Sequence, residues 1–249
     1  MTDALLPIPW LTPDDETTPL PDPETALAEP NGLLAIGGSL SPGRLEAAYR
    51  TGVFPWFSPG EPILWWSPDP RAIISPSGFH ISRSLRRALR RDDYRISLDT
   101  AFDAVVAACA EPRADQLGTW ITTDMQAAYS RLHVAGLAHS IEVWRGGAVV
   151  GGLYGVSLGG AFFGESMFSR TPNGSKIAMA WLMRQIGAWG FHFLDCQMPT
   201  AHLLSMGAEQ IPRKRFLLAL AASQRQPTRT GPWQLDISRD AVTGERGDD

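Results

Sequence analysis

Cysteine and lysine are scarce in this chain of 249 residues, which has two of each. Cys109 and Cys196 are too few for a disulfide framework, and neither belongs to a Cys-x-x-Cys pair. No apolar run approaches the roughly 20 residues that cross a bilayer, and the first ten residues lack the basic start and apolar stretch of a secretory signal. These absences favour a cytoplasmic protein that does not contact a membrane.

Positive charge is also limited, because 22 Lys and Arg stand against 26 Asp and Glu and give a net charge of −4. Such a total argues against nucleic-acid binding through overall positive charge. The charges are nevertheless segregated: residues 1–43 hold seven carboxylates and no Arg or Lys, whereas residues 83–95 hold six of the twenty Arg and only two carboxylates. A solvated helix face would explain this cluster, but the segregation favours a surface that contacts phosphates.

Proline divides the chain, since 14 of the 20 Pro lie in residues 1–76, together with four of the nine Trp. Because proline fixes φ and lacks an N–H, this composition predicts neither a regular sheet nor long helices there. We expect a small Pro/Trp-rich N-terminal domain over residues 1–70 that begins with a loose acidic leader (1–30). A short helix is predicted to start at Pro42, with Ser41 as its N-cap and Tyr49 on its apolar face.

Residues 71–249 alternate helical and strand patterns and predict a second domain, with a polar, loose tail from Gln224. Apolar spacing predicts helices at 82–91, 99–110, 124–135 and 175–189, and strands at 94–98, 138–144, 148–156, 160–166 and 191–197. Asp99 is the expected N-cap of the second helix and Thr122 or Thr123 that of the third, and Gly146-Gly147 predicts a hairpin turn between the strands 138–144 and 148–156. This order predicts an α+β domain with a mixed sheet, which resembles the acetyltransferase-like (GNAT-like) fold.

Several familiar sites are missing. The five His and two Cys show no metal-ligand spacing, the segment 164–168 lacks the second Gly of a hydrolase elbow, and no Gly-rich phosphate loop is present. Polar side chains nevertheless interrupt apolar strands: alternation places Asp195 and Gln197 on one face, and in another strand it places Glu165 on the same face as Phe163. A buried carboxylate is costly without a partner. Either Asp195 caps a loop and Glu165 pairs with an Arg, or these groups form a reaction centre.

Four tryptophans lie in or near Pro/Gly-rich segments rather than on periodic core faces: Trp56, Trp65, Trp66 and Trp120. Each one alone would most simply anchor a loop in the core. Four together favour a surface that stacks on a nucleobase or lines an apolar pocket.

The chain also carries long characteristic strings of residues. They are Glu29-Pro-Asn-Gly-Leu-Leu-Ala-Ile-Gly-Gly-Ser-Leu-Ser-Pro42, Gly52-Val-Phe-Pro-Trp-Phe-Ser-Pro-Gly60, Leu64-Trp-Trp-Ser-Pro-Asp-Pro-Arg71, Gly118-Thr-Trp-Ile-Thr122, Ala138-His-Ser-Ile-Glu-Val-Trp144, Phe163-Gly-Glu-Ser-Met-Phe-Ser-Arg170, Leu194-Asp-Cys-Gln197 and His202-Leu-Leu-Ser-Met-Gly207. In this order, over about residues 29–220, the sequence resembles the leucyl/phenylalanyl-tRNA–protein transferase family.

The resemblance implies an enzyme that moves Leu or Phe, and less readily Met, from aminoacyl-tRNA to the α-amine of proteins that begin with Arg or Lys. The product is an N-terminal degradation signal. The family is similar in fold to acetyltransferases, but Arg170-Thr-Pro-Asn-Gly-Ser175 lacks the Gly spacing of an acetyl-CoA loop. The resemblance therefore implies neither acetyl-CoA nor any other cofactor, and no metal.

The resemblance also assigns roles by position. It places Asp195, Gln197 and Glu165 at the reaction centre, Trp56, Trp120, Phe162 and Met167 around the aminoacyl-adenosine, and Arg90, Arg91 and Arg95 against the tRNA. From the residue types, Gln197 would aim the amine, Asp195 would accept or relay its proton, and Glu165 would pair with the acceptor's first side chain.

Two other functions stay open. One is a CoA-dependent acyltransferase of the same fold, which the missing loop disfavours. The other is a non-catalytic RNA-binding module, which would not need Asp195 and Gln197 together. A monomer is expected, because nothing in the sequence indicates an oligomer interface.

Overall fold

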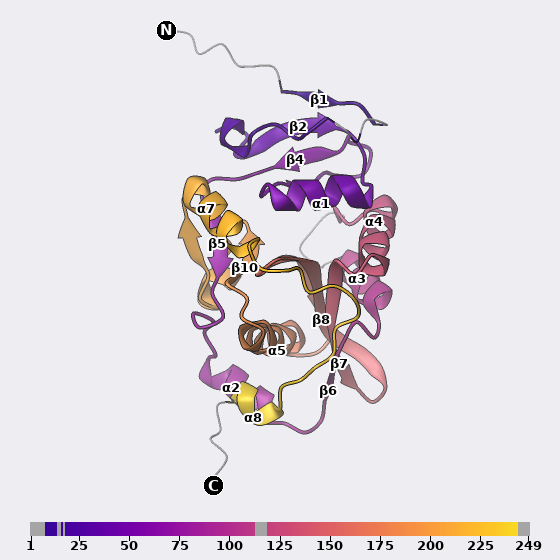
Figure 1. The fold of residues 1–249 in the computed structure, drawn as a ribbon. Coiled ribbons are helices and arrows are strands. Elements are labelled where there is room, and N and C mark those ends of the chain that lie inside the picture. The colour runs from indigo at the N-terminus through magenta and orange to yellow at the C-terminus, as the bar shows by residue number, and fades with distance from the viewer. Residues whose placement is uncertain (1–7, 14–15, 17, 113–118, 244–249) are drawn as a thin grey trace.

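The computed structural model describes residues 8–13, 16, 18–112 and 119–243 and contains two sheets (Figure 1). The first has four strands in the order β1-β2-β4-β3, and the second has seven in the order β11-β5-β10-β9-β8-β7-β6. Helix α1 lies between the two sheets (Figure 1). The mixture of helices with separate sheets confirms the predicted α+β class. Among the described residues no helix has the length and apolar character needed to cross a membrane.

The N-terminal unit, residues 8–70, carries the smaller sheet. Its elements are β1 (Trp10–Leu11), η1 (Pro23–Thr25), β2 (Leu33–Gly37), α1 (Pro42–Arg50), β3 (Phe54–Pro55) and β4 (Leu64–Trp66). The expectation of no regular sheet was wrong, because strands of two to five residues fit between the prolines, and Pro55 lies on the edge strand. The start of α1 is as predicted: the Ser41 hydroxyl accepts a hydrogen bond from the Arg44 N–H, with Pro42 in the first turn.

The acidic leader is not loose throughout. Trp10 and Leu11 pair in parallel with Ile36 and Gly37 of β2, and Leu11 is buried. Its acidic residues Asp3, Asp14 and Asp15 lie outside the described residues.

The larger sheet, called here the main sheet, positions the site. Its strands are β5 (Arg71–Ile74), β6 (Arg95–Leu98), β7 (Ala138–Arg145), β8 (Ala148–Leu158), β9 (Ala161–Ser169), β10 (Phe193–Gln197) and β11 (Glu209–Ile211). Among the described strands of the main sheet only β9 and β10 pair in parallel, and their pairing ends at Asp195 opposite Phe163. Beyond that point β9 continues to Ser169, while β10 bulges between Asp195 and Gln197. The two strands therefore separate and leave a gap in the sheet.

Helices cover both faces of the main sheet. They are α2 (Arg83–Leu89), α3 (Phe102–Ala110), α4 (Thr123–Val134), α5 (Gly174–Ala188), α6 (Ala201–Ser205), α7 (Arg213–Ser223) and α8 (Arg239–Thr243). Because side chains alternate along a strand, Phe163 and Phe162 lie on opposite faces of the main sheet. Phe163 packs in the core between the sheet and α1, α3 and α4, and Phe162 in the core between the sheet and α2 and α5. The apolar core thus has two layers, with the sheet between them.

Two expectations for the second domain were wrong, and they have one cause. Asp99 does not cap α3, whose N-cap is Ala101. The Asp99 carboxylate instead accepts hydrogen bonds from the backbone N–H groups of Ser140 (2.8 Å) and Trp233 (2.6 Å). Up to residue 243, where the described part ends, the tail is not loose, because Trp233 is only 3% exposed and stacks on His139 at a ring distance of 3.8 Å. Asp99 therefore anchors the returning C-terminal segment.

Candidate active site

A pocket of about 110 Å³ lies where β9 and β10 separate. Its lining is mainly apolar, from Leu153, Met167, Met179, Leu194 and Leu203, with Tyr154, Gly164, Glu165, Ser166, Cys196 and Gln197 completing the wall. Burial raises the pKa of the Cys196 thiol, so this group stays protonated and is a poor nucleophile. The groups of the pocket best suited to bind an amine or accept its proton are thus the Glu165 carboxylate and the Gln197 amide, which lie next to an apolar floor.

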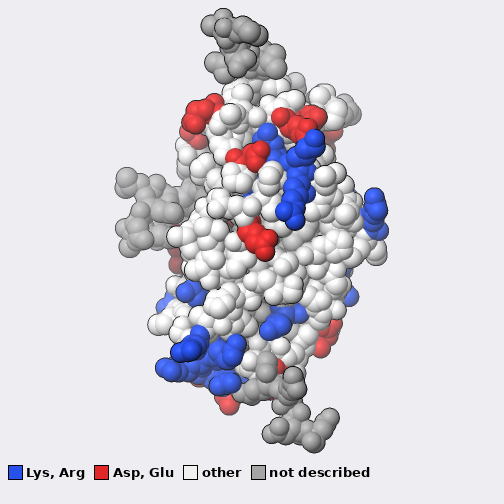
Figure 2. All heavy atoms as spheres, turned by 90° about the vertical axis from the view of Figure 1, so that its left-hand side faces the viewer, with Lys and Arg blue, Asp and Glu red and all other residues white. Residues whose placement is uncertain are grey.

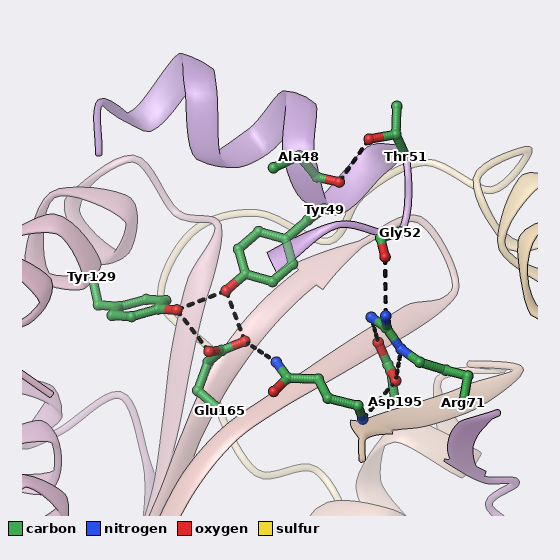
Figure 3. A network of polar contacts seen from close by, with 9 residues as sticks. Ala48, Tyr49, Thr51, Gly52, Arg71, Tyr129, Glu165 and Asp195 are labelled. Carbon is green, nitrogen blue, oxygen red and sulfur yellow. Dashed lines mark hydrogen bonds and ion pairs between the residues drawn. The ribbon is translucent and has the colours of Figure 1, made fainter. Parts of the chain in front are cut away.

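Glu165 is the centre of a compact hydrogen-bond network (Figure 3). Its Oε1 accepts from the Tyr49 hydroxyl (2.7 Å) and from Gln197 Nε2 (2.9 Å), and its Oε2 accepts from the Tyr129 hydroxyl (2.6 Å). Burial raises the pKa of Glu165 to about 7, and the two hydroxyl donors lower it only in part. This carboxyl group keeps some contact with solvent and changes protonation close to neutral pH.

The two tyrosines come from different parts of the fold. Tyr49 lies on α1 of the N-terminal unit and Tyr129 on α4, and their hydroxyl oxygens are 2.7 Å apart. Burial and the nearby Glu165 raise the pKa values of both well above the ordinary range. Both therefore remain neutral hydroxyl groups that can donate to the carboxylate.

Asp195 belongs to a buried ion pair (Figure 3). Arg71 at the start of β5 donates from Nε to Oδ1 (2.9 Å) and from Nη2 to Oδ2 (2.6 Å), and the two side chains are 1% and 0% exposed. Asp195 Oδ1 also accepts from the backbone N–H of Gln197 at 2.8 Å. One of the two interpretations of the sequence had Glu165 pair with an Arg. In the structure it is Asp195 that pairs with an Arg. Asp195 is buried in this ion pair and does not line the pocket, whereas Glu165 does, so the geometry favours Asp195 as a positioning group rather than as the proton acceptor.

The predicted alternation does not extend to Gln197. This residue has a φ of +64° and follows the bulge, so its side chain turns to Glu165 while that of Asp195 turns to Arg71. The expectation that the two side chains share a strand face was therefore wrong. The expectation that Glu165 shares a face with Phe163 is supported, because both contact Tyr49.

The residues expected around the aminoacyl-adenosine fall in three places. Met167 lines the pocket. Phe162 does not: it is 1% exposed and packs against Trp233, with ring centres 5.7 Å apart, in the layer beneath. Its place in the pocket wall is taken by Met179 and Leu203 of the covering helices.

The tryptophans lie outside the described pocket lining. Trp56 is 38% exposed and meets Trp66 edge-on at 5.6 Å, and Trp120 is half-buried against the core. Trp65 is fully buried and donates to Gly37 O, which gives it a structural role. Stacking on a nucleobase by Trp56 and Trp120 stays a prediction.

The arginines of residues 83–95 form an exposed surface over α2 and the turn into β6. Figure 2 shows blue side chains gathered at the lower end of the molecule, where Figure 1 places α2, whereas α1 lies in the upper part of Figure 1, between the two sheets. Arg91 pairs with Asp93 at 2.6 Å, and the Arg95 guanidinium lies 4.9 Å from the Trp144 ring centre. A ligand that contacts both Arg90–Arg95 and Glu165 has to extend along the molecule.

Sequence analysis missed three residues of the site: Tyr49, Tyr129 and Arg71. Tyr49 was assigned to the apolar face of the helix that starts at Pro42, which is correct for its ring but overlooks its hydroxyl. Arg71 had a detectable signal, because it is a lone charge directly before the apolar Ala72-Ile-Ile74 of a strand. Buried charges of this kind need a partner, and Asp195 is the partner here.

Comparison with known proteins identifies the family. A family model described as leucyl/phenylalanyl-tRNA protein transferase matches residues 73–221, and the model of its N-terminal domain matches residues 38–69. The chain belongs to the leucyl/phenylalanyl-tRNA protein transferase family. It is therefore a transferase, as the resemblance implied.

Curated relatives in this family match over nearly their whole length. The transferase of Alkalilimnicola ehrlichii is 55% identical over 95% of this chain and 92% of its own, and that of Nitrosomonas europaea is 56% identical over 89% and 94%. Solved structures with a similar fold include a GCN5-related N-acetyltransferase from Kribbella flavida (TM-score 0.36, 11% identity, 68% of this chain and 60% of that one). L-PGS from Bacillus licheniformis matches with a TM-score of 0.38, 14% identity, and coverage of 68% and 54%.

Proposed function

We propose that this transferase moves Leu or Phe from aminoacyl-tRNA to the N-terminal α-amine of proteins that begin with Arg or Lys. The added residue would serve as a degradation signal. The observation that carries the proposal is the contact of Glu165 with Gln197 at the rim of an apolar pocket in a member of this family. The reaction needs a site for an apolar side chain next to polar groups that handle an amine, and this pocket supplies both.

The pocket suits the side chain of the transferred residue. At about 110 Å³ it is of the same order as an apolar cavity of about 150 Å³ that binds benzene. Its floor combines Leu with the flexible side chains of Met167 and Met179, which adapt to different shapes. Shape of this kind separates similar side chains by only about 1–3 kcal/mol, so weaker use of Met is expected.

The reaction is the aminolysis of an ester. The amine nitrogen attacks the carbonyl carbon, the bond from that carbon to the ribose oxygen breaks, the amine loses a proton and the ribose oxygen gains one. Because the acyl group is already activated as an ester, no ATP, metal or other cofactor is required. Alignment of the amine with the ester can supply much of the acceleration.

Glu165 is the best candidate for the proton acceptor. Its pKa of about 7 is close to that of an α-amine, about 7.7–8.0, so transfer between them is nearly balanced. Gln197 donates its Nε2 to Glu165, which leaves its Oε1 to accept a hydrogen bond from the incoming amine. Pairing of Glu165 with the acceptor's Arg or Lys is less well supported, because a carboxyl group with a pKa of about 7 is only partly charged at neutral pH.

The α2 surface is the proposed contact with the tRNA. Replacing Arg90, Arg91 and Arg95 by Gln should weaken tRNA binding and flatten its salt dependence, because each lost phosphate contact removes about one unit from the log–log slope. Binding would be measured from about 50 to 200 mM salt. The matched control replaces the exposed Lys214 and Arg215 of α7 and should leave the slope unchanged. A salt dependence equal to that of the wild type in the triple variant would contradict the assignment.

Pocket size can be tested at Gly164. A Cβ there would lie 3.5 Å from Leu194 Cδ2, an ordinary contact, so Gly164→Ala adds a methyl group to the lining without strain. We expect kcat/KM for the Leu and Phe donors to fall about tenfold, with Phe affected more because it is larger. Gly43→Ala on α1, where the Cβ meets only Glu16 at 3.6 Å, is the control. If kcat/KM for the Leu and Phe donors is the same in Gly164→Ala as in Gly43→Ala, the side chain of the transferred residue binds elsewhere.

The function itself is tested by donor choice. The chain would be incubated with a protein that begins with Arg and with either labelled Leu-tRNA or labelled acetyl-CoA. The proposal predicts label on the protein only from Leu-tRNA. Label from acetyl-CoA would support a CoA-dependent acyltransferase instead, and tight tRNA binding without any transfer would support an RNA-binding module.

A further inference from the structure

A closed ring of contacts links the N-terminal unit to the reaction centre, and Arg71 is the member of the ring that the mechanism has not used. Arg71 holds Asp195 through two hydrogen bonds and donates a third, from Nη1, to the backbone oxygen of Gly52 at 3.0 Å (Figure 3). Gly52 follows Thr51, the C-cap of α1, and its N–H donates to Tyr49 O at 3.1 Å. Tyr49 in turn donates to Glu165, so the ring closes on the carboxyl group of the site.

The other half of the ring explains the backbone of Gln197. A side chain with a Cβ rarely adopts a φ of +64°, because the left-handed region brings it close to its own backbone. The hydrogen bond from Gln197 N to Asp195 Oδ1 fixes that turn. Asp195 can hold it only while its own carboxylate is held, and Arg71 does this with both nitrogens of one edge of its guanidinium.

Arg71 itself has little freedom to move. Its guanidinium carbon lies 4.9 Å from the ring centre of Phe54 on β3 and 4.4 Å from that of Phe216 on α7. A planar group between two rings, with hydrogen bonds along its edges, is held in one orientation. A lysine would keep the charge but could not form the two parallel hydrogen bonds.

We propose that Arg71 is a positioning residue for the transfer reaction: it fixes Asp195, and through Asp195 the left-handed turn that aims the Gln197 amide at Glu165. Because Arg71 also holds Gly52, the N-terminal unit and the reaction centre take up their working geometry together. This inference rests on the proposed function for its kinetic consequence, but the positioning itself is independent of which acyl group is transferred.

Arg71→Lys tests the proposal by kinetics. We expect kcat to fall about 10- to 100-fold, as for a reacting group displaced by about 1 Å, with KM for the aminoacyl-tRNA nearly unchanged. The pH at which kcat rises should stay near that of the wild type, because lysine keeps the charge that lowers the pKa of Glu165. Arg71→Met removes this charge and should move the rise to higher pH, a shift that a mere loss of folded protein would not cause.

Arg213→Lys is the matched control. Arg213 also joins α7 to the N-terminal unit, through a 2.6 Å hydrogen bond from Nη1 to Ser67 O, but it does not touch Asp195. We expect this variant to keep the kcat of the wild type. The proposal would be overturned if Arg71→Lys had the same kcat as Arg213→Lys. It would also be overturned if the decrease in kcat of Arg71→Lys matched the fraction of this variant that is unfolded.

Amide hydrogen exchange gives a readout that does not depend on activity. In Arg71→Lys the backbone N–H of Gln197 should exchange faster than in the wild type, because its acceptor Asp195 is no longer held. Arg213→Lys should not show this change. Protection of Gln197 equal to that of the wild type in Arg71→Lys would refute the positioning role. Absence of transfer by the wild type would refute only the proposed function.

Discussion

Replacing Glu165 by glutamine should reduce transfer about 10²- to 10⁴-fold, the usual contribution of a positioned general base. The reason is that in the proposed mechanism Glu165, with a pKa of about 7, accepts the proton that the attacking amine has to lose. Glutamine keeps the shape of the side chain and can still contact the Tyr49 and Tyr129 hydroxyls, but it cannot take up a proton. Binding of aminoacyl-tRNA should change little.

The pH dependence identifies this role. In the wild type both Glu165 and the amine must be deprotonated, so log kcat/KM should rise with a slope of two below pH about 7 and of one up to about pH 8. In Glu165→Gln only the slope of one, from the amine, should remain. Glu46→Gln on the exposed side of α1 is the control and should keep both slopes. A slope of two in the Glu165→Gln variant would exclude Glu165 as the base.

The same substitution should stabilise the fold. A carboxyl group whose pKa is raised from 4.5 to about 7 by folding is costly to ionise, so it lowers stability progressively as pH rises from about 4.5 to 7. Allowing for the contact of Glu165 with solvent, we expect Glu165→Gln to be about 1–3 kcal/mol more stable than the wild type at pH 8 and nearly equal to it at pH 4. Urea unfolding at the two pH values would measure the difference in the free energy of unfolding. A Glu165→Gln variant less stable than the wild type at pH 8 would mean that ionised Glu165 does not lower stability.

Removing the Trp233 side chain should have the largest effect on stability. Trp233→Ala should lower the free energy of unfolding by about 3–5 kcal/mol, as for other large core residues. The ring stacks on His139 and contacts Phe162, Trp189 and Phe191, so the cavity would open in the layer beneath the pocket. Denaturant unfolding would give the value.

Trp56→Ala provides the comparison for Trp233, because that ring is much more exposed. It should cost much less stability, while its effect on binding of aminoacyl-tRNA should be larger if it stacks on the terminal adenosine. An equal loss of stability in the two variants would mean that the C-terminal segment is not part of the folded core.

The parts of the fold that sequence analysis predicted correctly carry a local signal. Ser41 and Pro42 start α1, Thr122 caps α4, and Gly146-Gly147 turns between β7 and β8, because each needs only residues a few positions apart. The errors came from interactions between distant segments. Asp99 follows a typical helix-capping pattern, yet its partner is Trp233, more than a hundred residues later.

In the site, too, features that depend on nearby residues were predicted and contacts between distant segments were not. Apolar strand context correctly singled out Glu165, Asp195 and Gln197 as groups that need partners. It could not show that Asp195 is satisfied by Arg71 and Glu165 by two tyrosines, since those partners lie on other elements. Nor could alternation predict the bulge that separates Asp195 from Gln197, because a bulge breaks the period on which alternation depends. The proposed division of roles within the site rests on these contacts.

The central claim is that the chain forms a peptide bond between Leu or Phe and a protein N-terminus. Its most direct test is mass spectrometry of a protein that begins with Arg, after incubation with the enzyme and Leu-tRNA. We expect a mass increase of one leucyl residue, placed before the Arg by fragmentation, and no increase when the α-amine is acetylated beforehand. Addition of leucine to a side chain, or an unchanged mass with fully active Leu-tRNA, would contradict it.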